Sequence, residues 1–243
     1  MSIVAIIPAR YASTRLPGKP LLAETGRPLI RHVVEAAGRS ARVDRVIVAT
    51  DDARIAAAVR AFGGEVAMTR EDHPSGTDRV AEVAATLDDV ELVVNLQGDE
   101  PEASGASLDA LVDLMRADPG APMGTLATAI FEENTFNDPS CVKVVIAGGR
   151  ALYFSRSPIP HHRDGVIGGN YGYLHLGIYA YRPDFLRRLS ALPPSPLEQV
   201  EKLEQLRVLE AGVPIAVGIV EERSVGIDTP EDYRRFVERW NTK

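Results

Sequence analysis

The sequence is poor in cysteine, lysine and aromatic residues, and these shortages exclude several classes of protein. The single cysteine, Cys141, cannot form a disulfide within the chain, and its apolar neighbour Val142 favours a buried, inert thiol. No apolar run is long enough to span a membrane as a helix. A formal net charge of −7 argues against general nucleic-acid binding, which needs a basic face. Because no basic segment with a cleavage site precedes the first apolar run, we expect a cytoplasmic protein.

The composition is that of an ordinary globular protein, with 45% hydrophobic and 25% charged residues. A length of 243 residues suits one α/β domain, so we predict a single domain over residues 1–243. Strand-like apolar runs alternate with helical patterns in the first half, which is typical of successive βαβ units. The runs are 3–7, 46–49, 66–68 and 92–94, and helical patterns at 55–62, 79–87 and 108–115 follow the last three.

The pattern changes from about Pro139. Two apolar runs, 142–146 and 151–154, flank Gly148-Gly149-Arg150, which resembles a hairpin turn. We therefore predict an antiparallel excursion over about 139–182. A strand at 176–181, one helix at 197–210, a strand at 215–220 and a helix at 230–240 are expected to follow.

The first strand runs directly into a loop that contains three cations, Arg10, Arg15 and Lys19. Ligands of open α/β sheets bind beyond the carboxyl ends of the strands. Arginine holds phosphate oxygens with two parallel hydrogen bonds, and lysine acts as a point charge. Since the chain contains only four lysines, the cluster favours a phosphate site over a solvated basic loop.

Two carboxylates are candidate ligands for a hard cation. Asp99 follows a buried-type strand in a tight loop made by Gly98 and Pro101, and Asp228 precedes the last helix. Each residue also has an interpretation that needs no ligand. Asp99 is then an ordinary turn aspartate, and Asp228 is a cap of the last helix.

Four further residues are open to two interpretations each. Ser75 and Arg79 flank a predicted helix start and suit either an anion or a plain helix cap. Glu204 falls on the expected apolar side of its helix, where a carboxylate must be paired or used. His175, between two leucines, is either a structural or a catalytic histidine. Adjacent His161 and His162 diverge on extended backbone, so we predict no zinc site there.

Taken together, these segments resemble the 3-deoxy-manno-octulosonate (Kdo) cytidylyltransferases, also called CMP-Kdo synthetases. The resemblance covers nearly the whole chain. Its motifs are IPARYASTRLPGKPL at 7–21, MTREDHPSGTDR at 68–79, LQGDEP at 96–101, ALYFSRSPIP at 151–160, HLGIYAYR at 175–182, SPLEQVEKLEQLR at 195–207 and GIDTPED at 226–232.

The resemblance implies transfer of CMP from CTP to the anomeric hydroxyl of Kdo, with release of pyrophosphate, for lipopolysaccharide biosynthesis. It also implies Mg²⁺ as cofactor, a homodimer, and a Rossmann-like three-layer α/β fold with a mostly parallel mixed sheet and a small antiparallel dimerisation arm. The residues it assigns to the nucleotide are Arg10, Arg15, Lys19, Ser75, Arg79 and Gln97, and those it assigns to the sugar acid are Arg156, His175, Tyr179, Glu204 and Gln205. Asp99 and Asp228 are implied as magnesium ligands and, with Arg15 and Lys19, as the catalytic residues.

One position departs from the family pattern. Members often have Lys or Arg immediately before the motif histidine, whereas this chain has Leu174. The accepted acid is therefore left open between Kdo and another sugar acid such as a sialic acid. The same motifs also suit a nucleotidyltransferase for a phosphorylated sugar, or a nucleotide sensor without catalytic activity. The first loop lacks the G-x-G-x-x-G pattern of a nicotinamide-dependent oxidoreductase.

Overall fold

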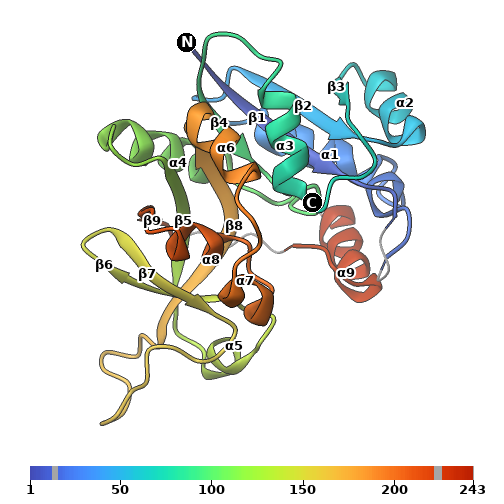
Figure 1. Ribbon diagram of the computed structural model, residues 1–243. Coiled ribbons are helices and arrows are strands. Elements are labelled where there is room, and N and C mark those ends of the chain that lie inside the picture. Colours follow the sequence, from blue (N-terminus) through green and yellow to red (C-terminus); the bar gives the residue numbers. More distant parts are fainter. Residues whose placement is uncertain (13–15, 222–225, 243) are drawn as a thin grey trace. The chain divides into compact units, whose positions relative to one another are not determined.

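The computed structural model describes residues 1–12, 16–221 and 226–242 (Figure 1). The chain forms two compact units: unit 1 comprises 1–109 and 224–243, and unit 2 comprises 110–223. A compact unit need not be an independent folding domain, so the single domain over 1–243 stays a prediction.

Unit 1 contains a parallel sheet whose central strand is the apolar run at the start of the chain. The strands are β1 (Ser2–Ala9), β2 (Arg45–Thr50), β3 (Glu65–Met68) and β4 (Val90–Asn95), in the order β3-β2-β1-β4. Residues 3–7 of β1 are completely buried, which explains the lack of polar alternation in this run. The four strands predicted for this region are therefore confirmed.

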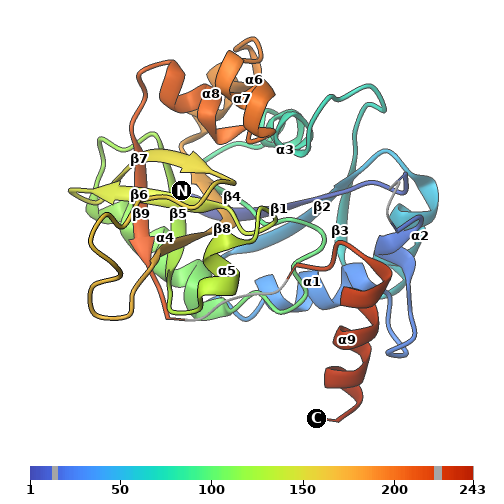
Figure 2. The same cartoon turned by 90° about the horizontal axis from the view of Figure 1, so that it is seen from below.

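The helices predicted in this part of the chain begin and end within a few residues of the predicted positions, whereas η1 and α1 were not predicted. They are the 3₁₀ helix η1 (Lys19–Leu21), α1 (Leu29–Ala37), α2 (Ala53–Ala61), α3 (Gly76–Ala84) and α9 (Pro230–Asn241), while α4 (Gly105–Ala117) crosses the sequence boundary between the units. Thr229 caps α9 through a reciprocal capping box with Asp232. The ring of His32 in α1 lies 4.4 Å from that of Trp240, so α1 packs against α9 (Figure 2).

Unit 2 contains a mixed set of strands. They are β5 (Met123–Ile130), β6 (Lys143–Ala147), β7 (Arg150–Ser155), β8 (Gly172–Tyr181) and β9 (Ile215–Ile219), in the order β8-β5-β9-β7-β6, and β6 also pairs with β8. β5 pairs antiparallel with β8 and parallel with β9. The predicted hairpin is confirmed as β6 and β7, with Gly148 and Gly149 at φ values of 55° and 71° in the turn.

Four helices of the described residues lie wholly in unit 2, and one sequence prediction about them is wrong. They are α5 (Glu133–Asn137), α6 (Pro183–Ser190), α7 (Pro196–Glu201) and α8 (Gln205–Glu210). The single helix expected at 197–210 is two helices, because Lys202 adopts a left-handed conformation with φ of 56° and ends α7. Glu204 is consequently the N-cap residue of α8.

No helix in the described part of the chain is both long and apolar enough to cross a membrane.

Candidate active site

The loops that follow β1 and β4 approach each other closely in unit 1. A Cβ atom on Gly98 would lie 2.7 Å from the carbonyl oxygen of Pro8, so only glycine fits there without a shift of backbone. A Cβ atom on Gly76, at the start of α3, would lie 3.3 Å from the Pro8 ring and 3.7 Å from Oε1 of Gln97. Three segments thus meet at the carboxyl ends of the parallel strands, where a ligand site was predicted.

Lys19 joins the two predicted magnesium ligands. Its Nζ donates to Oδ2 of Asp99 at 2.8 Å and to the carbonyl oxygen of Ile227 at 2.7 Å, and it lies 3.7 Å from Oδ1 of Asp228. The Lys19 side chain is only 14% exposed. Residues far apart in sequence therefore form one cluster in which a single ammonium lies between two carboxylates.

The donor set of this cluster fits a magnesium ion. Mg²⁺ prefers oxygen ligands and usually takes one or two carboxylates, with waters and substrate phosphates completing its coordination. Asp99 and Asp228 supply two carboxylates within 3.7 Å of one positive charge. Within the described ranges, no group of three or more His, Cys, Asp or Glu side chains is placed to enclose a metal ion without a substrate.

The other cations of the first loop have different positions. Arg10 donates from its guanidinium to the carbonyl oxygen of His73 at 2.8 Å, which ties the first loop to the segment that precedes α3. Arg15 lies outside the described residues. The prediction that both bind the triphosphate stays a prediction.

The segments that contain Ser75 and Gln97 lie side by side at the start of α3. Ser75 is the N-cap residue of α3, where its hydroxyl accepts from the backbone N–H of Asp78 at 3.2 Å and donates to the Asp78 carboxylate at 2.7 Å. Gln97 donates to Oδ1 of Asn95 at 3.3 Å. The capping interpretation of Ser75 is thus confirmed, and its contact with a nucleotide remains a prediction.

Arg79 is completely buried, which the sequence did not indicate. Its guanidinium donates to Oδ2 of Asp51 at 2.9 Å and also to the hydroxyl of Thr69. The neighbouring Asp52, and not Asp51, caps α2. The buried pair gives Arg79 a structural role, and the direct nucleotide contact predicted for it is untested.

Unit 2 presents a second group of polar residues, in which Arg156 is anchored to main chain. Its Nε donates to the carbonyl oxygen of Glu201 at 2.9 Å, and its Nη1 donates to that of Pro139 at 3.0 Å. The fully buried Lys143 donates to the carbonyl oxygens of Asp138, Cys141 and Arg156 at 2.9, 2.5 and 2.6 Å. Burial lowers the pKa of Lys143. Sequence analysis missed this lysine, although its place in an apolar run was a signal.

His175 and Tyr179 lie close together on β8. Their ring centroids are 5.4 Å apart, and Phe154 packs edge-on against His175 at 4.9 Å. Burial lowers the pKa of His175 to about 3, so the ring is neutral at neutral pH. The pKa of Tyr179 is raised by burial and, to a lesser extent, by Tyr181 and Glu204. The two side chains therefore offer neutral hydrogen-bonding groups.

Glu204 and Gln205 stand at the junction between α7 and α8. Glu204 is exposed, so the expectation that it lies on the apolar side of a helix is wrong, because the break after α7 turns it into the N-cap residue of α8. It is still near enough to Tyr179 to raise the pKa of that phenol. Gln205 is 5% exposed. Their contact with a sugar acid stays a prediction.

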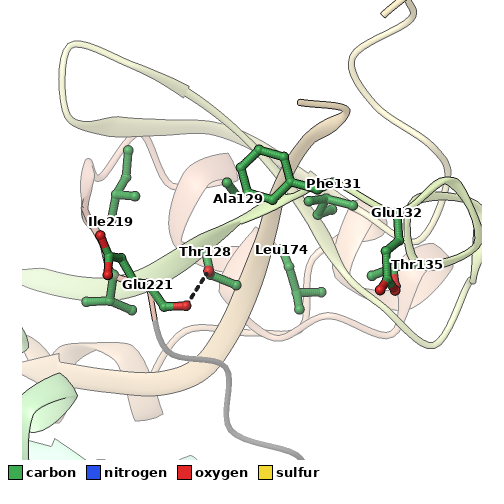
Figure 3. Close-up of a pocket in the computed structure, with 10 residues that line it drawn as sticks. Thr128, Ala129, Phe131, Glu132, Thr135, Leu174, Ile219 and Glu221 are labelled. Atoms are coloured by element: carbon green, nitrogen blue, oxygen red, sulfur yellow. Dashed lines mark hydrogen bonds between the residues drawn. The ribbon is translucent and has the colours of Figure 1, made fainter. Parts of the chain in front are cut away.

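A pocket of about 500 Å³ is lined by residues of β5 and β8 and of the segments that follow β5 and β9 (Figure 3). Leu174 and Thr128 line it, and they are direct partners in the sheet, as Ala127 and His175 are. Successive residues of a strand point to opposite faces, so Leu174 points away from His175. The departure at Leu174 is therefore no reason to doubt the group of residues around His175.

Comparison with known proteins places this chain among nucleotide-transferring enzymes. Residues 4–219 match the family model described as "Cytidylyltransferase". The chain is 53% identical over 240 residues to a 3-deoxy-manno-octulosonate cytidylyltransferase of Syntrophobacter fumaroxidans, covering 98% of this chain and 96% of the relative. It is 51% identical to the same-named protein of Syntrophotalea carbinolica, covering 97% of each.

Solved structures agree with the sequence relatives. A CMP:2-keto-3-deoxy-manno-octonic acid synthetase complexed with CTP is 46% identical, with a TM-score of 0.94, 100% coverage of this chain and 99% of that chain. A 4-diphosphocytidyl-2C-methyl-D-erythritol synthase of Anaerococcus prevotii is 16% identical, with a TM-score of 0.63 over 100% of this chain and 99% of that chain. The second likeness shows a shared fold alone.

Proposed function

Because the chain belongs to the family of 3-deoxy-manno-octulosonate cytidylyltransferases, we propose that it transfers CMP from CTP to the anomeric hydroxyl of Kdo. In this reaction the hydroxyl oxygen forms a bond to the α-phosphorus, the bond to the pyrophosphate oxygen breaks, and the hydroxyl proton is released. CMP-Kdo and pyrophosphate are the products, and CMP-Kdo serves lipopolysaccharide biosynthesis. Since CTP is an intracellular nucleotide, this activity also supports the cytoplasmic location expected above.

The observation that carries the proposal is the position of Lys19 between Asp99 and Asp228. Phosphoryl transfer depends mainly on positioning and on stabilisation of negative charge. A cation and two carboxylates at the ends of parallel strands supply both, because Lys19 fixes the carboxylates and balances their charge. Arg10 and Arg15 are proposed to bind the triphosphate beside them.

Asp99 and Asp228 are the residues that would hold magnesium. The bound ion would supply Lewis-acid stabilisation of phosphate charge and would lower the pKa of the attacking hydroxyl. Lys19 donates two hydrogen bonds to oxygen atoms of the protein and lies 3.7 Å from Oδ1 of Asp228. Its ammonium has three protons to donate, and we propose that pyrophosphate accepts from the third.

The sugar acid is proposed to bind the second group of residues. Arg156 is the natural counter-ion for its carboxylate, since guanidinium and carboxylate groups match in shape and charge. Tyr179, Glu204 and Gln205 are proposed to bind its hydroxyl groups. We also propose that the protein is a homodimer in which the β6–β7 hairpin contributes to the interface.

The test is pyrophosphate release from purified protein with CTP, Mg²⁺ and Kdo. ATP, GTP and UTP replace CTP in parallel reactions, and N-acetylneuraminic acid replaces Kdo. Release with CTP and Kdo alone is the expected result. Release only with another acid would overturn the assignment of the substrate, and no release with any pair would favour the sensor.

A further inference from the structure

Thr125 is a completely buried polar residue in β5 that faces an irregular part of β8. The pairing of β5 with β8 shifts register between Thr125 and Leu126, so β8 bulges around Gly177. The Thr125 hydroxyl fills this bulge. Its Oγ1 lies 3.1 Å from the carbonyl oxygen of Leu176, 2.8 Å from that of Ile178 and 3.0 Å from Nε2 of His175.

The number of protons at this hydroxyl determines which nitrogen of His175 carries hydrogen. A threonine hydroxyl has one proton to donate, and both carbonyl oxygens can only accept. If the proton pointed to His175, two carbonyl oxygens would face the hydroxyl oxygen with lone pair against lone pair. The stable arrangement directs the proton at the carbonyls, so the hydroxyl oxygen accepts a hydrogen bond from Nε2–H of His175.

A neutral histidine with hydrogen on Nε2 has an unprotonated Nδ1, which can only accept a hydrogen bond. Within the described part of the chain, Nδ1 has no hydrogen-bond partner. Phe154 and Tyr179 pack against the ring at centroid distances of 4.9 and 5.4 Å and limit its rotation. The ring thus presents one acceptor in a fixed direction.

We propose that Thr125 is a positioning residue that holds His175 in the Nε2–H form, so that Nδ1 accepts a hydrogen bond from a hydroxyl group of the sugar acid and repels its carboxylate. The ligand in this inference rests on the proposed function, but the hydrogen-bond arrangement does not. A carboxylate at Nδ1 would place two acceptors against each other, whereas a sugar hydroxyl donates. Thr125 would therefore act on specificity without touching the substrate.

The surroundings of His175 support a neutral ring. Burial lowers its pKa, and the phenol that packs against the ring is that of Tyr179, at a centroid distance of 5.4 Å. Burial raises the pKa of Tyr179, so this phenol is neutral at neutral pH. Glu204 raises the pKa of Tyr179, whereas the pKa of His175 is lowered by burial with no opposing effect from this carboxylate.

The first test is nuclear magnetic resonance of the full chain labelled with ¹⁵N in its five histidines. The spectrum of H175F identifies the His175 signals by their loss. At pH 7 we expect a protonated Nε2 and an unprotonated Nδ1 in the absence of any substrate. Hydrogen on Nδ1, or on both nitrogens, would overturn the proposal whatever reaction the protein performs.

The second test compares T125V with T125S. Valine has nearly the same shape but no hydroxyl, whereas serine keeps it. We expect T125V to lose the fixed tautomer and to raise KM for Kdo about tenfold or more, with KM for CTP unchanged, and T125S to remain within about threefold of wild type. Equal changes for both substrates, or no rescue by serine, would show a purely structural role.

The third test asks which group of the sugar acid His175 contacts. Wild type and H175F are assayed with Kdo, with monodeoxy analogues that each lack one hydroxyl, and with the carboxamide of Kdo. One deoxy analogue should be weaker than Kdo with wild type but equal to Kdo with H175F, as a double-mutant cycle requires for a direct contact. The same behaviour with the carboxamide alone would overturn the proposal, while inactivity of wild type on Kdo would instead refute the proposed function.

Discussion

Nζ of Lys19 lies 2.8 Å from Oδ2 of Asp99 and makes a second hydrogen bond to the carbonyl oxygen of Ile227. η1 begins at Lys19, Asp99 follows β4, and Ile227 precedes α9, so one ammonium group fixes three separate segments of unit 1. The residues interpreted from sequence as a phosphate cation and a metal ligand are direct partners. Mutations at either residue should therefore affect both metal binding and local structure.

Replacing Asp99 with asparagine should reduce kcat about 100-fold or more at saturating Mg²⁺. The substitution keeps the shape of the side chain but removes a charged metal ligand, which corresponds to roughly 3 kcal/mol of transition-state stabilisation. Pyrophosphate release at increasing Mg²⁺ measures the effect. The control is D164N, an equal change of charge at a side chain that is 94% exposed, and it should leave kcat unchanged. Turnover of D99N at the wild-type rate would remove Asp99 from the reaction.

Replacing Lys19 with methionine should make the stability of the protein depend more strongly on Mg²⁺. The substitution removes the cation between Asp99 and Asp228, so the two carboxylates repel each other until a metal ion binds. Melting temperature measured with and without Mg²⁺ should show a larger increase for K19M than for wild type. An increase equal to that of wild type would indicate that Mg²⁺ does not bind these carboxylates. K19R should have a lower kcat than wild type, because the planar guanidinium of arginine does not replace the compact ammonium of lysine.

Replacing Asp51 with asparagine should destabilise the protein by about 3 kcal/mol, because the buried guanidinium of Arg79 would lose its charged partner. Urea unfolding measures the change. The matched control is E65Q, which removes one partner of the Arg45–Glu65 pair, whose side chains are 47% and 46% exposed. That change should cost less than about 1 kcal/mol. A small effect of D51N would show that Arg79 does not depend on this pair and would favour a direct role in nucleotide binding.

The sequence was sufficient to predict elements whose pattern is strong. The continuous apolar run of β1 and the Gly148–Gly149 turn each have one simple structural solution. β5 escaped prediction because its sequence MGTLATAI is rich in small residues with weak strand preference. Those small residues are needed for packing, since a Cβ atom on Gly124 would lie 2.7 Å from Sδ of Met115.

The sequence indicated which residues belong to the candidate site better than it indicated how those residues contact one another. The position of Lys19 and Asp99 at the ends of strands followed from the order of elements, but their ion pair depends on loop geometry. Thr125 gave no signal, because a threonine in a strand is ordinary and its role depends on a bulge in a partner 50 residues away in sequence. Lys202 ended α7 without the glycine or proline that usually marks such a position.

Lowering the pH from 7 to 5 should cost the protein about 2 kcal/mol of stability through His175 alone. Burial lowers the pKa of His175 to about 3, whereas an unfolded chain has the ordinary histidine value of 6.5. Between these values the unfolded state binds a proton that the folded state does not, so stability present above pH 6.5 is lost as the pH falls. Urea unfolding of wild type and H175F at pH 7 and 5 measures this share, and the comparison cancels His32, whose pKa burial also lowers. The stability of H175F should fall less than that of wild type, and equal losses in both proteins would show that His175 is protonated in the folded state as readily as in water.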